Sequence, residues 1–177
     1  MVSAQDVEYL RECVALAREA LTTGDAPFGS LLVNTSTSSI LARDRNRTVS
    51  GNSPLLPDSP TGADATLHPE FTLARWAALN LAPEERANCT VYTSGEHCAM
   101  CSAAHAYVGL GRIMFASSTV QLGQWMKELE VGGKRALRPL GINEVAPVIQ
   151  IEGPVEEFAE EIKELHRQHR DGQSSRK

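Results

Sequence analysis

The sequence predicts an α/β fold with three layers, in which helices cover both faces of a mixed central sheet of about five strands. Two observations lead to this prediction. Two apolar or β-branched runs near the N-terminus flank a Thr/Ser turn, and later runs of this kind alternate with segments of helical character. With 177 residues, 42% of them hydrophobic, the chain can bury a sizeable core. We expect a single domain over residues 1–170 and a polar tail at 171–177.

The first third of the chain is expected to form a helix, a hairpin and a long loop. Apolar residues recur at helical spacing over Ser3–Thr22, and Gly24 follows as a stop signal. The runs Phe28–Asn34 and Ile40–Thr48 predict the hairpin. Prolines, glycines and serines concentrate in Ser50–Thr66, so this stretch is predicted to be a loop, and its length favours a functional role.

The rest of the chain alternates helices and strands. Helices are predicted over four segments, Pro69–Leu79, Cys98–Leu110, Val120–Leu129 and Val155–Arg170. Strands are predicted over three segments, Thr90–Ser94, Arg112–Ala116 and Val145–Ile151, and Gly132-Gly133 marks a loop.

Composition and charge disfavour several classes of function. The net charge of −5 argues against a nucleic-acid partner, because phosphate contacts require concentrated Lys and Arg. No apolar run approaches the roughly 18 residues of a membrane span, and the N-terminus lacks the pattern of a signal peptide. We therefore expect a cytoplasmic protein without a membrane segment. Cys13 and Cys89 lie inside apolar patterns and are expected to pack in the core.

Two short motifs contain the residue types of a catalytic zinc site. His68-Pro69-Glu70 precedes Cys98-Ala99-Met100-Cys101, which follows an apolar run. One imidazole and two thiolates leave a fourth tetrahedral position for water, and a nearby carboxylate can carry the proton of that water. Proline suits the first turn of a helix, and two cysteines three positions apart at a helix start can point to one side. His68 alone could be a capping histidine, but the combined motifs predict zinc-assisted hydrolysis.

These motifs resemble the zinc-dependent cytidine/nucleobase deaminase superfamily, whose pattern is His-x-Glu followed by Pro-Cys-x-x-Cys. The resemblance covers about residues 5 to 120 and is strongest to the guanine/cytosine deaminase and tRNA adenosine deaminase branch. Four segments carry it, namely Asp25–Val33, Arg45–Arg47, Tyr92–Cys101 and Gly111–Ala116.

The resemblance implies a cytidine deaminase-like fold and one zinc ion per chain, held by His68, Cys98 and Cys101. It implies that Glu70 is the catalytic residue that moves a proton from water to the leaving amine. The implied reaction is hydrolytic deamination, with release of ammonia. The implied substrate is a small-molecule amino-heterocycle: free guanine or cytosine, or a related base, nucleoside or triazine. The implied assembly is a homodimer.

Substrate recognition depends on fewer residues. The resemblance implies that Asn46 hydrogen-bonds the substrate ring and that Phe28 packs near it; a strand-end turn residue and a core aromatic residue are the respective alternatives. Pro27-Phe28-Gly29 is similar to guanine and cytosine deaminases that act on free bases. His97 replaces the proline of the family pattern and is either a substrate contact or a solvent-facing residue at the helix start. We also expect the loop Ser50–Thr66 to cover part of the pocket.

Two other functions stay open. An RNA-directed adenosine deaminase shares the motifs, although Val108-Gly109 stands where tRNA-acting relatives carry a basic residue. A zinc-stabilised interaction domain without catalysis would need a fourth ligand. His105, on the same predicted helix face as the cysteines, either provides that ligand or packs behind the metal helix. Trp125 could approach the mouth of the pocket, but no motif identifies its role.

Overall fold

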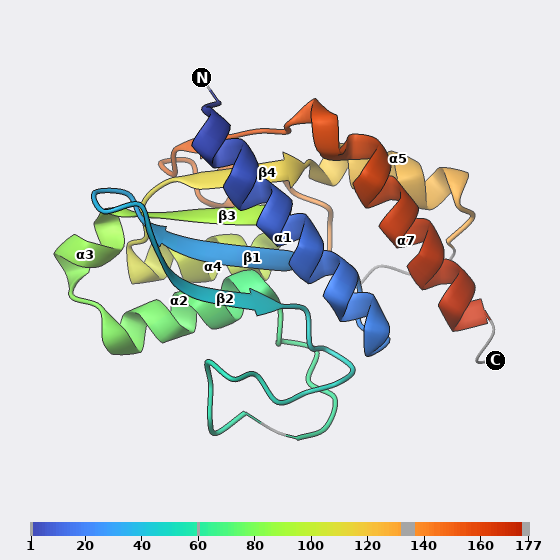
Figure 1. Cartoon of the computed structure of the whole chain (residues 1–177), viewed down its shortest axis with the longest axis horizontal. Coiled ribbons are helices and arrows are strands. Elements are labelled where there is room, and N and C mark those ends of the chain that lie inside the picture. The colour runs from blue at the N-terminus through green and yellow to red at the C-terminus, as the bar shows by residue number, and fades with distance from the viewer. Residues whose placement is uncertain (1, 60, 132–136, 175–177) are drawn as a thin grey trace.

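The central sheet is mixed and five-stranded, with the strand order β2-β1-β3-β4-β5 (Figure 1). The computed structural model describes residues 2–59, 61–131 and 137–174. Its strands have these bounds: β1 Gly29–Asn34, β2 Ser39–Arg45, β3 Cys89–Gly95, β4 Ile113–Ser117 and β5 Ile151–Glu152. β1 pairs antiparallel with β2 and β3, whereas β4 pairs parallel with β3 and β5. The structure confirms the predicted hairpin and the predicted mixed sheet.

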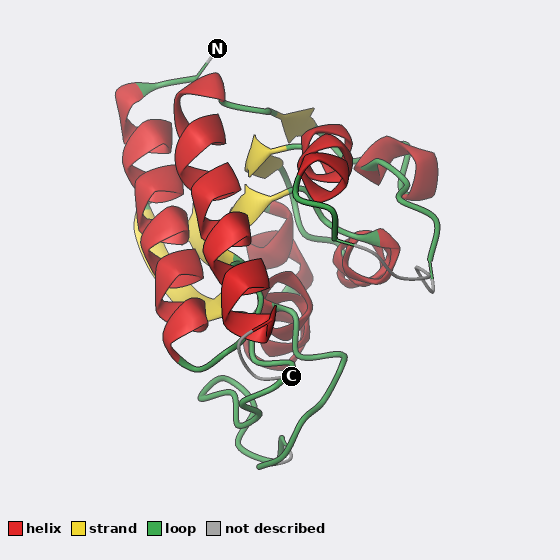
Figure 2. Ribbon diagram, turned by 90° about the vertical axis from the view of Figure 1, so that its right-hand side faces the viewer, coloured by secondary structure: helices red, strands yellow, loops and turns green. Residues whose placement is uncertain are grey.

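Helices cover both faces of the sheet and complete the predicted three layers (Figure 2). One face packs against the helices α1 (Ala4–Thr22), α5 (Thr119–Glu128) and α7 (Ala159–Ser174). The other face packs against α2 (Pro69–Asn80) and α4 (Ala99–Val108). Short helical segments lie in the connections: α3 Pro83–Ala87, α6 Ile142–Val145 and the 3-10 turn η1 Glu156–Phe158.

The side chains of β1 show why helices are needed on both faces. Successive residues of a strand point to opposite sides, so Leu31 and Val33 join the core formed with α1 and α7, whereas Leu32 joins the core formed with α2 and α4. All three side chains are buried. A continuous apolar run such as this one is stable only where both faces of the strand are covered.

The C-terminal part of the chain differs from the prediction. The expected strand over Val145–Ile151 is wrong for most of its length, because α6 ends at Val145 and β5 begins only at Ile151. Pro147 lies between them and has no backbone N–H to donate to a sheet. The last helix begins after η1 and continues to Ser174, into the segment expected to be a tail. The expected Gly132-Gly133 loop lies outside the described residues.

Two features of the fold were expected from composition: the absence of a membrane-spanning helix among the described residues and the burial of two cysteines. No described helix combines the length and the apolar character that a membrane span requires. Cys13 and Cys89 are buried free thiols, one in each core, as predicted. The cysteines that remain for chemistry are therefore Cys98 and Cys101.

Candidate active site

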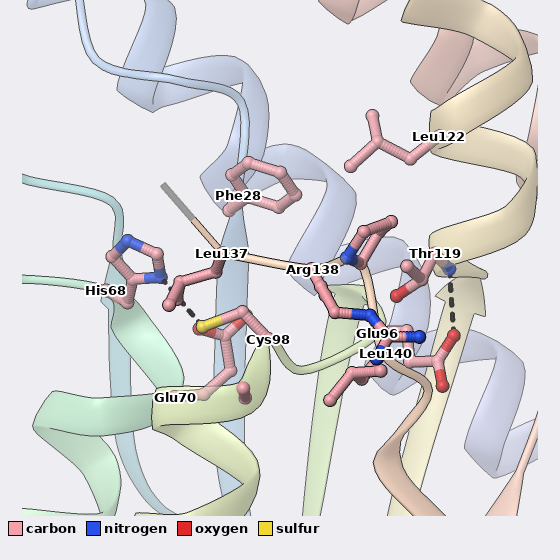
Figure 3. A pocket seen from close by; sticks show the side chains of 12 residues that line it. Phe28, His68, Glu70, Glu96, Cys98, Thr119, Leu122, Leu137, Arg138 and Leu140 are labelled. Carbon is pink, nitrogen blue, oxygen red and sulfur yellow. Dashed lines mark hydrogen bonds between the residues drawn. The ribbon is translucent and has the colours of Figure 1, made fainter. Parts of the chain in front are cut away.

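The N-termini of α2 and α4 carry the residues of the predicted zinc site (Figure 3). His68 is the N-cap residue of α2, and Pro69 follows in the first turn, where a missing N–H removes no helical hydrogen bond. Cys98 is the N-cap residue of α4, which begins shortly after β3 ends, and Cys101 lies in the first turn of α4. Because α2 and α4 pack against each other, both helix starts face the same space.

The three donor atoms fit one tetrahedral zinc ion. Cys98 Sγ lies 3.6 Å from Cys101 Sγ and 3.8 Å from His68 Nδ1, and Cys101 Sγ lies 3.7 Å from the same nitrogen. Zn–S bonds of about 2.3 Å and Zn–N bonds of about 2.0 Å separate two sulfurs by about 3.8 Å, and a sulfur from a nitrogen by about 3.5 Å, in tetrahedral geometry. His68, Cys98 and Cys101 therefore form the zinc site, with a fourth position left over.

The electrostatics of the site favour a thiolate at Cys98. The hydrogen bond with Cys101, together with the hydrogen bond and charge of His68, outweighs burial and lowers the pKa of Cys98 to about 4. The same hydrogen bond, together with burial, raises the pKa of Cys101. Burial lowers the pKa of His68, but the hydrogen bond with Cys98 and the charge of Glu70 raise it by more. A thiolate is the form of cysteine that binds metal.

Glu70 lies in the first turn of α2, beside the zinc ligands and outside the ligand group. Its carboxylate is buried and accepts hydrogen bonds from Cys101 Sγ at 3.5 Å and from Thr93 Oγ1 at 3.1 Å. Burial raises the pKa of Glu70, because the charged form loses its hydration. Thr93 was not among the site residues expected from the sequence. The signal that could have found it is a hydroxyl in an apolar strand that leads directly to the metal cysteines.

A cavity of about 370 Å³ opens beside the zinc ligands (Figure 3). His68, Glu70 and Cys98 line one end of it. The remaining lining residues form the other walls: Phe28, Glu96, Ala99, Thr119, Leu122, Leu137, Arg138, Pro139 and Leu140. The size suits a small molecule, and polar groups at the metal end of an otherwise mostly apolar cavity are typical of a ligand site.

The structure places Phe28 in the wall of this cavity, and its contact with a substrate stays a prediction. Its ring packs against the backbone of Gly95, where an added Cβ would lie only 2.8 Å from Phe28 Cε1. On another side, the ring of His166 from α7 meets it edge to face, with ring centroids 5.3 Å apart. Gly95 and His166 therefore define the position of the aromatic wall.

Asn46 is buried at the end of β2 but does not line the cavity. Its Oδ1 accepts hydrogen bonds from the backbone N–H and the hydroxyl of Thr48, at 3.1 and 2.8 Å. Its Nδ2 has no hydrogen-bond partner among the described residues. Arg45 Nη1 donates to Asn46 O at 3.0 Å and pairs with Asp25 at 3.2 Å, which holds this strand end in place. Thr48 thus orients the amide, whose donor group is unpaired within the described part of the chain.

His97 does not lie where a substrate contact would require. Its ring has 0% exposure, is absent from the cavity wall and packs edge to face against His105, with ring centroids 5.6 Å apart. The expectation of a substrate-binding or solvent-facing His97 is therefore corrected: the side chain turns into the interior, and burial lowers its pKa well below the ordinary value. His105 is not a fourth zinc ligand, because it lies outside the group of donor atoms formed by His68, Cys98 and Cys101. Its Nε2 donates to Gly111 O at 2.8 Å, at the end of its own helix.

The loop over residues 50–66 does not supply the cavity wall that we expected from it. None of its described residues lines the cavity. Instead, Ser53 Oγ donates to Asp44 Oδ2 at 2.7 Å, and Thr72 of α2 donates to the same oxygen at 2.8 Å. The first bond fastens the loop to β2, and the second joins β2 to α2. The loop extends away from the sheet (Figure 1). Trp125 also does not line the cavity and packs in the core with α7.

Comparisons with known proteins agree with this geometry. The profile of the cytidine and deoxycytidylate deaminase zinc-binding region matches residues 3–117, which include the zinc ligands. A probable cytosine deaminase from Schizosaccharomyces pombe is 33% identical over 124 residues, which is 68% of this chain and 65% of the relative. The chain thus matches slightly less than two thirds of that protein.

Solved structures show the same fold. A guanine deaminase from Nitrosomonas europaea superposes with a TM-score of 0.65 at 16% identity, over 97% of this chain and 86% of the other. A structure from a study of A-to-I editing by tRNA:A34 deaminases has a TM-score of 0.50 at 27% identity, over 65% of this chain and 78% of the other. From the profile match and the fitting zinc ligands, we conclude that the chain belongs to the cytidine and deoxycytidylate deaminase zinc-binding family.

Proposed function

We propose that the protein is a zinc-dependent hydrolytic deaminase that releases ammonia from the exocyclic amino group of a free nucleobase or a related small heterocycle. The observation that carries this proposal is the carboxylate of Glu70, which lines the cavity beside three zinc ligands without belonging to them. A closed structural zinc site has no use for such a carboxylate, whereas a hydrolytic site needs one to move a proton.

The chemistry divides between the metal and this chain. His68, Cys98 and Cys101 would hold the zinc ion, which would act as a Lewis acid and lower the pKa of water toward neutrality. Glu70 takes a proton from the attacking water and delivers it to the amino group, so that water adds to the ring carbon, the C–N bond breaks and ammonia leaves. Thr93 holds one carboxylate oxygen of Glu70 in position. The second proton of the water ends on the neighbouring ring nitrogen, so the product is the heterocycle with a carbonyl group in place of the amino group.

The walls of the cavity support a planar substrate. Phe28 offers an aromatic face, and Leu122, Leu137 and Leu140 offer apolar contacts. Asn46 does not line the cavity, but its Nδ2 has no hydrogen-bond partner among the described residues, and we propose it as the donor to a ring nitrogen or carbonyl of the substrate. The relatives named as cytosine and guanine deaminases favour a base over a larger molecule.

An RNA-directed adenosine deaminase is the second candidate, and the 27% identity with a tRNA:A34 deaminase structure is the observation in its favour. The net charge of −5 stands against it, because RNA binding rests on neutralised phosphates. A gel shift with tRNA at physiological salt separates the two. Salt-sensitive binding would favour the RNA substrate.

Assembly as a homodimer belongs to the same proposal. Leu79 on α2 and Tyr107 on α4 expose 73% and 92% of their surface, and these two helices lie next to each other. Such exposed apolar residues favour a protein contact. Light scattering of the purified protein measures the mass, and a monomer at micromolar concentration would contradict the dimer.

The decisive experiment measures ammonia release from a panel of free bases, nucleosides and aminotriazines. Replacing Glu70 by glutamine keeps the shape and removes the proton acceptor, so we expect turnover to fall by about 10²–10⁴-fold while zinc stays bound. Glu84→Gln, on the exposed surface of α3, is the control and keeps full activity. Undiminished turnover in Glu70→Gln would refute the mechanism. If the unaltered protein releases ammonia from no compound of the panel, the proposed function is refuted.

A further inference from the structure

Half of the cavity wall comes from the part of the chain that follows the family match. The match ends at residue 117, and the lining residues beyond it belong to α5 and to the segment before α6: Thr119, Leu122, Leu137, Arg138, Pro139 and Leu140. The zinc ligands and Glu70 all lie within the match. The cavity therefore joins a metal end inside the family match to a wall that lies beyond it. We call these six residues the distal wall.

Glu96 connects the distal wall to the turn that carries the metal cysteines. It stands directly after β3, two positions before Cys98. Its Oε2 accepts a hydrogen bond from the backbone N–H of Thr119 at 2.8 Å, which Figure 3 shows as a dashed line. Its Oε1 accepts one from the backbone N–H of Ile142 at 2.9 Å. One carboxylate thus holds the first residue of α5 and the first residue of α6.

The backbone around Glu96 leaves little freedom for this carboxylate. Glu96 N donates to Ser117 O at 2.8 Å, which keeps the residue in line with the end of β4. A Cβ added to Gly141 would lie 3.2 Å from Glu96 Oε1, so the chain before α6 passes close over the carboxylate. Backbone N–H groups at the start of a helix have no partner within the helix, and a carboxylate is a strong acceptor for them.

Two neighbouring side chains cap the same helices without crossing between segments. Gln121 Oε1 accepts from Ser118 N at 2.8 Å within α5, and Glu144 Oε2 accepts from Gly141 N at 2.7 Å at the start of α6. Each of these bonds stabilises its own helix start. The two bonds of Glu96, by contrast, join the first residues of α5 and α6 to the turn between β3 and α4, which carries the metal cysteines and which we call the metal turn.

From these contacts we infer that Glu96 is a positioning residue for substrate recognition: it fixes the distal wall relative to the zinc ligands and thereby sets how tightly the heterocycle is held. This inference rests on the proposed deaminase function. Glu96 also lines the cavity, but each of its carboxylate oxygens accepts a backbone N–H group, and we assign it to holding the wall and not to the reacting atoms. Its loss changes the fit of the substrate more than the chemical step.

The first test needs no substrate and uses hydrogen exchange, resolved by residue, on the zinc-loaded protein. Glu96→Ala is expected to speed exchange of the Thr119 and Ile142 amides by about tenfold or more, because each loses its acceptor. The amide of Ser102, which donates to Cys98 O at 2.9 Å in the metal turn, keeps its rate. In the control variants, exchange is expected to speed up elsewhere: at the Ser118 amide in Gln121→Ala and at the Gly141 amide in Glu144→Ala. Unchanged exchange at Thr119 and Ile142 would overturn the inference.

The second test uses the best substrate of the panel. Glu96→Ala is expected to raise KM by about tenfold, with kcat within about threefold of the unaltered protein and one zinc per chain. Glu96→Gln keeps one acceptor oxygen and is expected to raise KM by less. Glu144→Ala is expected to leave both constants unchanged. This pattern separates positioning from a general loss of stability, which would not depend on the acceptor.

Three results would contradict the positioning role. A fall in kcat at constant KM would place Glu96 in the chemical step. A rise in KM without faster exchange at Thr119 and Ile142 would mean that Glu96 contacts the substrate directly. Faster exchange at these amides without a change in KM would mean that Glu96 holds the wall but does not affect substrate recognition. If Glu96→Ala does not fold, Glu96→Gln carries both tests. If the unaltered protein deaminates nothing on the panel, the proposed function fails, and the exchange data still decide whether Glu96 holds the wall.

Discussion

The hydroxyl of Thr93 lies 3.1 Å from Oε1 of Glu70 and joins the central strand β3 to the first turn of α2. Thr93 Oγ1 also accepts a hydrogen bond from Ser30 Oγ at 2.9 Å, and the two residues are direct partners in the pairing of β1 with β3. The orientation of the catalytic carboxylate that we propose is therefore set by the sheet as well as by its own helix.

Thr93→Val removes this hydroxyl and keeps the shape of the side chain. We expect kcat to fall by about tenfold, because the buried carboxylate loses a donor that orients it. Zinc content is expected to stay at one ion per chain. Thr90→Val on the same strand is the matched control, since the Thr90 hydroxyl contacts Thr35 at 3.1 Å, away from Glu70. Equal kcat values in the two variants would contradict this prediction.

Gly95→Ala tests the aromatic wall. The new methyl group would lie 2.8 Å from Phe28 Cε1, so the ring must shift, and His166 on its other side limits where it can go. We expect a KM increase of about tenfold for purine-type substrates and a smaller one for pyrimidine-type substrates, because a displaced ring narrows the cavity. Gly123→Ala is the control, since nothing lies within 4 Å of its added Cβ. A uniform effect on both substrate types would argue against narrowing.

The lowered pKa of Asp6 predicts that the protein loses stability in acid. Burial acts to raise its pKa, but hydrogen bonds from Ser3, Tyr92 and Arg112 outweigh burial and lower it from 3.8 to about 2. The unfolded chain therefore binds the proton more readily, so the contribution of Asp6 is complete above about pH 4 and is lost as the pH falls toward 2. At neutral pH it amounts to about 2 kcal/mol.

Urea unfolding of Asp6→Asn measures this contribution. The free energy of unfolding is expected to drop by about 2 kcal/mol at pH 7 and by much less near pH 2, where about half of Asp6 is protonated in the unaltered protein as well. Glu8→Gln, an exposed carboxylate on the same helix, serves as the control. The same loss of stability at both pH values would show that the charge of Asp6 is not responsible.

Removal of zinc is expected to abolish ammonia release and to expose one thiol to labelling. Cys13, Cys89 and Cys101 are at most 1% exposed, whereas Cys98 is half-buried. A chelated sample should therefore alkylate first at Cys98, as located by peptide mass spectrometry, and added zinc should protect it and restore activity. Cys98→Ser is expected to lose zinc, and Cys89→Ser to keep it. Activity that survives complete chelation would rule out a catalytic metal.

The zinc ligands and Glu70 could be predicted from the sequence because their geometry is local. His68 and Glu70 lie at one helix start, and Cys98 and Cys101 lie at another, so spacing along the chain sets which side chains share a face. The helices around them carry clear start signals, and the structure places α2 and α4 within a few residues of the prediction.

The errors concern residues whose surroundings come from distant segments. His97 was expected at the surface or in the pocket, but its ring lies against His105 in the interior. The loop over 50–66 was expected to cover the pocket, but Asp44 fastens it elsewhere. Both segments are close in sequence to the zinc motifs, so we expected them at the cavity. Contacts with distant residues, which the spacing of the motifs does not predict, place them elsewhere.

By itself, the sequence determined the family pattern, the mixed sheet with helices on both faces, and the four residues at the metal end of the cavity. Only the tertiary structure decided that Thr93 orients Glu70, that His166 supports Phe28 and that Glu96 joins the distal wall to the metal turn. The physical reason is the range of the interactions. Helix periodicity acts over a few residues, whereas strand register and the docking of α5 and α7 are settled by packing between segments far apart in the chain.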